Sequence, residues 1–187
     1  MKINYTSKNT SVNAKRIPKG FSLLYPYGNV LDYGCGKYTK HVQEFCEEKG
    51  ATYYRYDKYN VPETENLVSL GRSRYYNTVY CNNVLNVIYD SYIIIEIIEN
   101  IVDVLAENGT AIFTIYEGDK SGIGKESKAD CWQRNEKTKD YAMFFEYADT
   151  KNCIITISND KILMKKLDRK TAKELSEYLN DCNESPF

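Results

Sequence analysis

The chain has 187 residues, of which 42% are hydrophobic and 27% are charged, and its 25 basic and 26 acidic side chains leave a net charge of −1. We expect one domain with a single core at this length, and the balanced charge argues against a general polyanion binder. No apolar run approaches the roughly 18 residues of a membrane-spanning helix, so no membrane association is expected.

The N-terminal residues lack the apolar stretch of a signal peptide, which predicts a cytoplasmic protein. The six cysteines form no CxxC pair and only one histidine accompanies them, so we expect free thiols and no metal site. Residues 1–28 are predicted to be an N-terminal arm, in which every charge is positive. This arm is either a solvated tail or a segment that folds over a bound ligand or an anionic substrate.

Residues 29–187 are predicted to form a single domain in which strands and helices alternate. A helix over 39–49 is expected to begin at Thr39 as its N-cap and to end at Gly50. The strands of this first half are short runs rich in β-forming residues or apolar residues. They are predicted at 29–33, 52–56, 67–70 and 78–81.

The second half begins with the clearest helix, 90–107, which is apolar on more than one side and is expected to end at Asn108-Gly109. A strand over 110–116, a glycine-bearing loop over 117–125 and a helix over 138–149 follow. Two further strands, 153–158 and 161–166, are predicted to form a hairpin. A last amphipathic helix is predicted to be capped by Asp168 and to turn its apolar side chains inward, namely Ala172, Leu175 and Leu179.

The order of these elements predicts an α/β fold. Strand, helix, strand alternation through the first half of the chain gives right-handed βαβ units and therefore a parallel sheet. The terminal hairpin adds an antiparallel strand to it. We expect a Rossmann-like, doubly wound, mostly parallel sheet with a C-terminal antiparallel hairpin.

Ligands of such sheets bind beyond the carboxyl ends of the strands, where the strand order reverses. Asp32-Tyr33-Gly34-Cys35-Gly36 follows the first strand, and its glycines let a backbone approach a ligand closely. Asp57 ends the second strand, where a carboxylate can accept both ribose hydroxyls of a nucleoside. Asn82-Asn83 and Glu117 follow two later strands, so all four features are expected at one edge.

These residues resemble the class I S-adenosylmethionine-dependent methyltransferases. Leu31 to Gly36 looks like the first motif of that family, an acid followed by GxG, and Asp57 matches its second, ribose-binding acid. Tyr80 to Ile88 is similar to the fourth-motif region of small methyltransferases often encoded by phages and mobile elements. The segment from Glu117 to Gln133 also looks like that subgroup.

The resemblance covers about residues 29–158 and implies class I methyltransferase architecture with S-adenosylmethionine as the cofactor. The implied cofactor-binding residues are Asp32, Gly34, Cys35, Gly36, Asp57, Asn82 and Asn83. Two departures are evident, because Tyr38 stands at the third glycine of the pattern and the segment between Asp57 and Thr78 is short. A dinucleotide is a poorer fit, because its pyrophosphate would be repelled by Asp32 and Thr39 replaces the expected small residue.

The implied reaction is direct displacement of the methyl group from sulfur by a nucleophile of an unidentified substrate. Glu117 is the candidate general base or orienting carboxylate, with a solvated loop acid as the alternative, and Asn83 is the candidate polar group near the acceptor. The Pro-Pro-Tyr sequence of DNA amino-methyltransferases is absent after Asn83. A Cys81 nucleophile is less favoured than a buried packing thiol.

The acceptor itself is weakly indicated. The basic arm and Trp132 slightly favour a nucleic acid or a nucleotide over a protein or a small molecule, with Trp132 stacking on a base or merely covering the loop. Two alternatives stay open for the function: an S-adenosylmethionine-binding module without transfer activity, and a nucleotide- or NAD-binding Rossmann protein.

Overall fold

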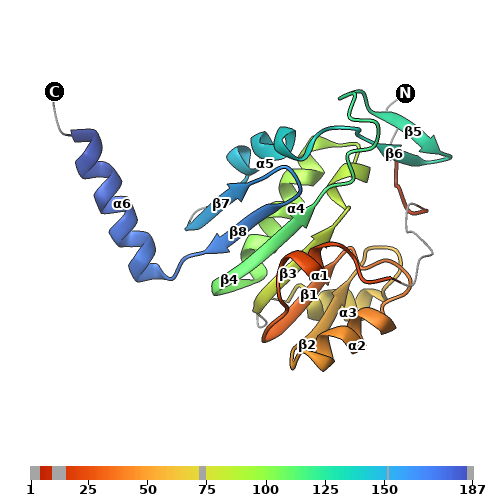
Figure 1. The fold of residues 1–187 in the computed structure, drawn as a ribbon, viewed down its shortest axis with the longest axis horizontal. Helices are drawn as coiled ribbons and strands as arrows, with labels where there is room; N and C mark the ends of the chain where they lie inside the picture. The colour runs from red at the N-terminus through yellow and green to blue at the C-terminus, as the bar shows by residue number, and fades with distance from the viewer. Residues whose placement is uncertain (1–4, 10–15, 72–74, 151, 185–187) are drawn as a thin grey trace.

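The computed structural model describes residues 5–9, 16–71, 75–150 and 152–184, although side chains beyond residue 178 are outside the description. Its centre is a six-stranded sheet in the order β2-β1-β3-β4-β8-β7 (Figure 1). The strands are β1 (Asn29–Tyr33), β2 (Thr52–Tyr56), β3 (Tyr76–Asn82), β4 (Leu105–Thr114), β7 (Cys153–Ile157) and β8 (Ile162–Lys166).

Strand directions confirm the predicted fold class. β2, β1, β3 and β4 pair in parallel, whereas β8 is antiparallel to β4 and β7 is antiparallel to β8. Because β1 has β2 on one side and β3 on the other, the strand order reverses at β1. The predicted ligand edge of the sheet therefore lies at the carboxyl ends of β1 and its two neighbours.

Helices cover both faces of the sheet. α1 (Gly20–Leu23) and α2 (Lys40–Glu48) bury Phe21, Val42 and Cys46 on one face. α4 (Ser91–Val104) and α5 (Ala142–Tyr147) form the larger core on the other, in which the isoleucines of α4 pack against apolar residues of the strands. α3 (Glu63–Ser69) lies on the α4 side, since the buried Tyr76 hydroxyl donates to the Ser69 carbonyl at 2.8 Å.

Part of the basic arm packs on the domain. The Phe21 ring stacks on Tyr80 with a centroid separation of 3.7 Å, and the Tyr80 hydroxyl donates to the Leu24 carbonyl at 2.7 Å. The His41 Nε2 atom lies 2.8 Å from the Arg16 carbonyl oxygen, which ties the arm to α2. Residues 16–28 are thus fixed against the sheet, and nothing is described for residues 10–15.

Two predicted elements were wrong in type or extent in this part of the chain. The segment 67–70 was predicted as a strand but lies in and just after α3, with Leu67 and Val68 exposed rather than buried. Helix α4 ends at Val104, and Asn108-Gly109 lies within β4, at an irregularity in its pairing with β3. A Cβ at Gly109 would come within 2.9 Å of the Tyr76 carbonyl oxygen, so glycine there permits close strand approach.

The predictions for the C-terminal segments were also partly right and partly wrong. The predicted 138–149 helix is a 3-10 turn, η2 (Thr138–Tyr141), followed by α5, and the apolar side chains of Tyr141, Phe144, Phe145 and Ala148 are buried. Asp168 caps α6 (Arg169–Glu184) as predicted, accepting from the Thr171 amide at 3.0 Å. However, α6 projects away from the sheet (Figure 1), so Leu175 is 41% exposed rather than inward. The Leu179 side chain lies outside the description.

A small hairpin stands apart from the main sheet, formed by β5 (Lys125–Lys128) and β6 (Cys131–Gln133). It follows β4 and lies at the carboxyl edge (Figure 1). Another short 3-10 turn, η1 (Leu85–Val87), follows β3, and the Arg134 amide donates to the Asn86 carbonyl at 2.9 Å. No helix among the described residues is long and apolar enough to cross a bilayer.

Candidate functional site at the carboxyl edge of the sheet

The glycine turn after β1 needs both of its glycines. Gly34 and Gly36 have φ angles of +78° and +73°, in the left-handed region that residues with a Cβ rarely adopt. At Gly34 a Cβ would also overlap the Val84 side chain. The amides of Gly34 and Cys35 both donate to the Tyr56 carbonyl, at 2.7 and 3.1 Å, so the turn is bound to the end of β2.

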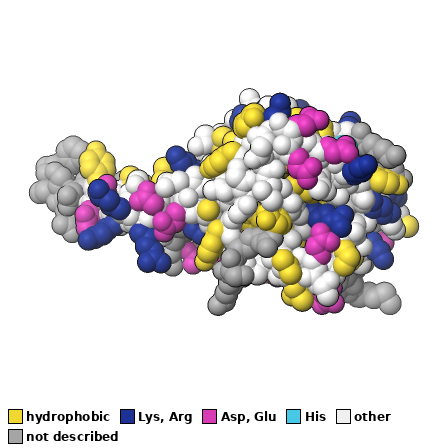
Figure 2. All heavy atoms as spheres, turned by 90° about the horizontal axis from the view of Figure 1, so that it is seen from below, with side chains coloured by type: hydrophobic (Ala, Val, Ile, Leu, Met, Phe, Trp, Pro, Cys, Tyr) yellow, Lys and Arg dark blue, Asp and Glu magenta, His cyan; other side chains and the backbone are white. Residues whose placement is uncertain are grey.

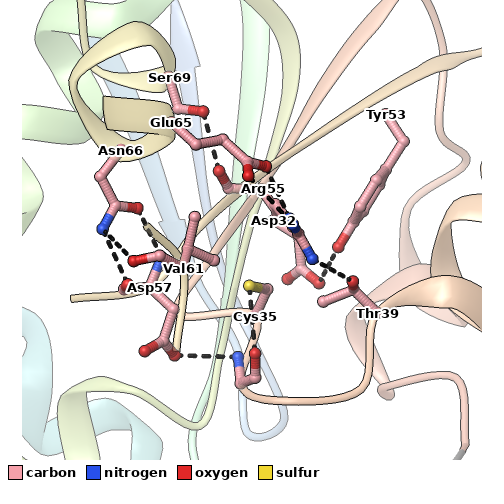
Figure 3. A network of polar contacts seen from close by, with 11 residues as sticks. Asp32, Cys35, Thr39, Tyr53, Arg55, Asp57, Val61, Glu65, Asn66 and Ser69 are labelled. Carbon is pink, nitrogen blue, oxygen red and sulfur yellow. Dashed lines mark hydrogen bonds and ion pairs between the residues drawn. The ribbon is translucent and has the colours of Figure 1, made fainter. Parts of the chain in front are cut away.

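Asp32 is a buried carboxylate beneath this turn. It is 2% exposed and accepts a hydrogen bond of 3.1 Å from the Tyr53 hydroxyl (Figure 3). Burial raises the pKa of Asp32 to about 7, with the nearby Asp57 adding to the rise and the Tyr53 bond opposing it. A cation placed beside a carboxyl group in this state stabilises its ionised form.

Asp57 holds the turn from the neighbouring strand. Its Oδ2 accepts from the Gly36 amide at 2.9 Å, and its Oδ1 accepts from the Tyr59 amide and from both nitrogens of Asn60 at 2.8–2.9 Å. Oδ1 therefore has no lone pair left for a ligand, whereas Oδ2 retains one. The expectation that Asp57 accepts both ribose hydroxyls needs revision, because one oxygen is already saturated by the protein.

A polar network supports the end of β2 (Figure 3). The Arg55 guanidinium forms two bonds to Glu65, of 2.6 and 3.0 Å, and donates to the Thr39 hydroxyl at 3.2 Å. Thr39 occupies the N-cap position of α2 as predicted, but its hydroxyl serves Arg55 instead of the helix. Asn66 completes the support, donating to the Asp57 carbonyl and accepting from its amide at 2.9 and 3.1 Å.

A cavity of about 1300 Å³ opens above the turn. It is larger than the roughly 300–1,000 Å³ of ordinary small-molecule sites, which leaves room for two ligands side by side. Among its lining residues are all seven predicted cofactor-binding residues: Asp32, Gly34, Cys35, Gly36, Asp57, Asn82 and Asn83. The structure therefore brings these seven together, and the described arm residues Lys8, Arg16 and Lys19 line the same cavity.

The two asparagines after β3 differ in their surroundings. The Asn82 Oδ1 atom accepts from the Gly20 amide and the Thr114 hydroxyl, each at 3.0 Å, which fixes the orientation of the amide. Its Nδ2 atom is buried and has no hydrogen-bond partner among the described residues. Asn83 is exposed with a φ of +54°, and its amide donates to the Thr114 carbonyl at 2.8 Å.

Glu117 does not occupy the place predicted for a base. Its Oε1 accepts from the Thr138 amide and hydroxyl at 2.7 and 2.9 Å, while its Oε2 pairs with Lys120 at 3.0 Å. The Thr138 amide and Lys120 lower the pKa of Glu117 to about 2, so it is a very weak base near neutral pH. Unlike Tyr116 and Gly118, Glu117 is not among the residues that line the cavity. Its contacts are those of a structural cap on η2.

Two thiols near the site are unreactive. Cys81 is 1% exposed in the core, and burial raises its pKa far above the ordinary range, so it is a packing residue. Burial also raises the pKa of Cys35, whose Sγ atom lies 3.6 Å from the Gly36 carbonyl oxygen. Neither group is set up as a nucleophile.

Several cavity residues were missed by the sequence reasoning. Asn86 and Gln133, which are 2% and 8% exposed, form a hydrogen bond of 3.1 Å. Tyr5, Tyr89 and Trp132 cluster at the same cavity, with centroid separations of 4.8–5.3 Å. Trp132 is predicted as a possible substrate contact, and its neighbour Gln133 as a residue suited to polar recognition, whereas Asn86, Tyr5 and Tyr89 are not predicted as substrate contacts.

Comparison with solved structures identifies the fold. A methyltransferase of Burkholderia thailandensis, 1,6-didemethyltoxoflavin-N1-methyltransferase with bound 1,6-didemethyltoxoflavin and S-adenosylhomocysteine, is 16% identical with a TM-score of 0.57. The match covers 79% of this chain and 75% of that one. An S-adenosylmethionine-dependent methyltransferase of Methanosarcina mazei is 11% identical with a TM-score of 0.56, covering 81% and 98% of the two chains.

This chain has the class I methyltransferase fold. No protein-family model matches the sequence, and no curated protein does. The cavity of this methyltransferase fold is lined by the glycine turn and both predicted acids. At such low identities the likeness establishes the fold, and the chemistry has to be argued from the residues themselves.

Proposed function

We propose that this chain is an S-adenosylmethionine-dependent methyltransferase that binds its cofactor at the carboxyl ends of β1, β2 and β3. One observation carries the proposal. Two left-handed glycines, flanked by two buried carboxylates from neighbouring strands, face a large cavity where the strand order of a class I methyltransferase fold reverses.

The charges of the site fit this cofactor. S-adenosylmethionine has a cationic ammonium and a cationic sulfonium, and Asp32 is a buried carboxylate whose pKa is raised by burial. A cation beside Asp32 favours its ionised form and gains an attraction strengthened by the low dielectric. The buried Asn82 Nδ2, which has no partner among the described residues, offers a donor to the carboxylate of the cofactor.

The ribose is proposed to bind at Asp57 through one oxygen. Oδ2 has a lone pair beyond its bond to the Gly36 amide, so it can accept from one hydroxyl, and that bond couples ribose binding to the shape of the turn. Removing the Asp57 side chain would therefore disturb the turn as well as the ribose contact. For that reason Asp32 is the cleaner position for a binding test.

When bound, the cofactor supplies a methyl group that is already activated by its positive sulfur. The contribution of the chain is to align the acceptor and to exclude water. Asn83, exposed at the cavity, is the proposed polar contact for the acceptor. Because Glu117 is bound to Thr138 and Lys120, we do not propose it as the base.

A binding module without transfer activity is the second candidate. This candidate is favoured because Glu117, the carboxylate predicted to act on the acceptor, is bound to Thr138 and Lys120 instead. A nucleotide- or NAD-binding protein is disfavoured, because a pyrophosphate at the turn would be repelled by Asp32 and Asp57. The small phage-type subgroup, a cytoplasmic location and a nucleic-acid or nucleotide acceptor stay predictions.

The test is a pair of measurements on the full chain. Isothermal titration calorimetry with S-adenosylmethionine, S-adenosylhomocysteine and NAD should give binding to the first two only. Incubation of the protein and labelled S-adenosylmethionine with fractionated cell extract should then label one fraction. Binding without labelling would favour the binding module, whereas binding of NAD alone would overturn the cofactor assignment.

A further inference from the structure

A buried polar pair lies in the wall of the cavity beyond the glycine turn. The Asn86 side chain comes from η1 and the Gln133 side chain from β6, which are 47 residues apart in the sequence. The Asn86 Nδ2 donates to the Gln133 Oε1 at 3.1 Å, and the Gln133 Nε2 donates to the Tyr116 carbonyl at 3.0 Å. The three residues form a chain of amide hydrogen bonds that ends at Asn86.

The direction of this chain is fixed by its backbone end. The Tyr116 carbonyl can only accept, so Gln133 must present its nitrogen to it and its oxygen to Asn86. Asn86 must then present its nitrogen to Gln133. The Asn86 Oδ1 atom is left as an acceptor on the far end, and rotation of neither amide improves the bonding.

That oxygen is buried and has no partner among the described residues. Asn86 is only 2% exposed, and an unsatisfied buried acceptor costs stability that an apolar residue would not cost. Because Asn86 lines the cavity, a ligand can supply the missing donor. A carbonyl oxygen of this kind selects for an N–H or O–H group and against an unprotonated acceptor.

The backbone around Asn86 is rigidly held. Its carbonyl accepts from the Arg134 amide at 2.9 Å. The Ser7 hydroxyl donates to the Val87 carbonyl at 2.6 Å and accepts from the Trp132 amide at 3.1 Å, so the arm joins η1 to β6. The Oδ1 position is thereby preset before any ligand arrives.

Aromatic rings also line this cavity. Trp132 directly precedes Gln133, and Tyr89 follows Asn86 by three residues, with the two ring centroids 4.8 Å apart. Tyr5 of the arm lies 5.0 Å from Trp132, tilted by 34°. Flat apolar faces and a fixed acceptor in the same cavity suit a planar ring that carries an N–H group.

We infer that the methyl-accepting molecule is a planar nitrogen heterocycle, and that Asn86 Oδ1 accepts a hydrogen bond from its amino or ring N–H group. Gln133 is a positioning residue, which orients the Asn86 amide. This inference rests on the proposed function, because it assigns the second ligand of the same cavity. The bond gives specificity and orientation. In the transfer, the acceptor nitrogen forms a bond to the methyl carbon while the carbon–sulfur bond breaks and its electron pair stays on sulfur. The methylated nitrogen then loses its proton to water, because Asn86 is neutral and does not take it up.

The sole tryptophan of the chain supplies the assay, since a ring that binds beside Trp132 changes its fluorescence. Two matched pairs of probes are titrated into protein saturated with S-adenosylhomocysteine. 9-Methyladenine and 1-methylcytosine carry an amino group as their only N–H donor, and their N,N-dimethylated derivatives carry none. Calorimetry on the same pairs separates binding from inner-filter effects.

In the wild-type chain at least one amino probe should bind ten times more tightly than its dimethylated partner. Asn86→Leu should abolish this preference. Gln133→Leu frees the Asn86 amide to turn, so it should reduce the preference at least threefold while binding persists. The control, Gln43→Leu, makes the same change on the exposed side of α2 and should leave the preference intact.

Three outcomes would overturn the inference: equal affinity within each pair, no binding of any probe at millimolar concentration, or an unchanged preference in Asn86→Leu. Loss of folding in Asn86→Leu is detected by its melting curve, and Gln133→Leu then decides the question. Failure of the proposed function is detected separately, because the protein would not bind S-adenosylhomocysteine in the first titration.

Discussion

Asp32 gives the sharpest test of the site, because its charge should strengthen ligand binding while it lowers the stability of the ligand-free protein. The variant Asp32→Asn keeps an oxygen for the Tyr53 hydroxyl, whose bond to Asp32 is 3.1 Å, and removes the charge. A buried charge without a cation destabilises the folded state. We therefore expect Asp32→Asn to be more stable than the wild type above neutral pH.

The magnitude follows from the pKa. Burial raises the pKa of Asp32 to about 7 in the folded chain, against about 3.9 in an unfolded one. A difference of about three units at roughly 1.36 kcal/mol each corresponds to about 4 kcal/mol of lost stability at high pH. The unpaired amide nitrogen of the new Asn side chain costs about 1–3 kcal/mol. The net gain of the variant is then about 1–3 kcal/mol.

The sign of the pH dependence is a stronger prediction than its size. Below about pH 3.9 Asp32 is neutral in both states, so its charge costs nothing. Through this group, the free energy of unfolding of the wild-type chain falls as the pH rises from about 3.9 through about 7. Above about pH 7 the contribution of Asp32 no longer changes. The advantage of Asp32→Asn should therefore grow over this window and then level off.

Urea unfolding of both proteins between pH 4.5 and 8.5 provides the measurement, and Asp103→Asn on the exposed side of α4 provides the matched control. The control should show no such window. In parallel, calorimetry should show Asp32→Asn binding S-adenosylhomocysteine at least tenfold more weakly. A variant that is less stable than the wild type at pH 8.5, or an advantage independent of pH, would refute the reasoning.

Three further predictions follow from the same geometry. Wild-type affinity for S-adenosylhomocysteine should fall about tenfold from pH 8 to pH 6, because Asp32 is protonated over that range; titration at the two pH values checks this. Gly34→Ala should abolish that binding and lower the melting temperature more than Gly50→Ala, since both positions have φ near +75° but only Gly34 faces a side chain, that of Val84. Equal losses in the two would contradict the steric argument. Glu117→Gln should lower the free energy of unfolding by about 1–2 kcal/mol at pH 7 without reducing ligand affinity, because it weakens the cap on η2; this stability difference should vanish as the pH falls from about 4.3 through about 2.

The distribution of charge on the surface also indicates which kind of acceptor fits the protein. Basic and acidic side chains are interspersed on the described face seen in Figure 2 and along α6, as the net charge of −1 suggested. A polyanion that binds mainly through its phosphates needs a continuous basic surface. A small heterocycle, recognised inside the cavity, makes no such demand on the surface.

The glycine turn after the first strand could be predicted from the sequence, because the conformation of a turn depends on the residues within it. A left-handed backbone demands Gly34 and Gly36, and an acid after a β-rich run indicates the end of a parallel strand. The alternation of strands and helices then places Asp57 beside the turn without any further information. The bond from the Gly36 amide to Asp57, 2.9 Å long, joins two motifs that the sequence shows separately.

The errors came where local and tertiary signals disagree. Leu67 and Val68 look like a buried strand, yet α3 forms because Asn66 binds the backbone of Asp57 and Glu65 binds Arg55. Asn108-Gly109 looks like a helix end, but it lies within β4, where the pairing with β3 is irregular and the strands approach closely. Hydrogen bonds to the end of β2 in the first case, and strand pairing with β3 in the second, outweighed a weak intrinsic preference.

Glu117 shows the same limit at the site itself. Its position after a strand predicted a catalytic acid, and only the fold reveals that Thr138, 21 residues later, occupies its carboxylate. The sequence by itself determined the alternation of strands and helices around the first strand, the glycine turn and the pair of acids, because backbone conformation and strand polarity depend on neighbouring residues. Only the tertiary structure decided which polar atoms are satisfied by the protein and which, like Asn86 Oδ1, are left for a ligand, because hydrogen bonds between distant segments exist only once the chain has folded.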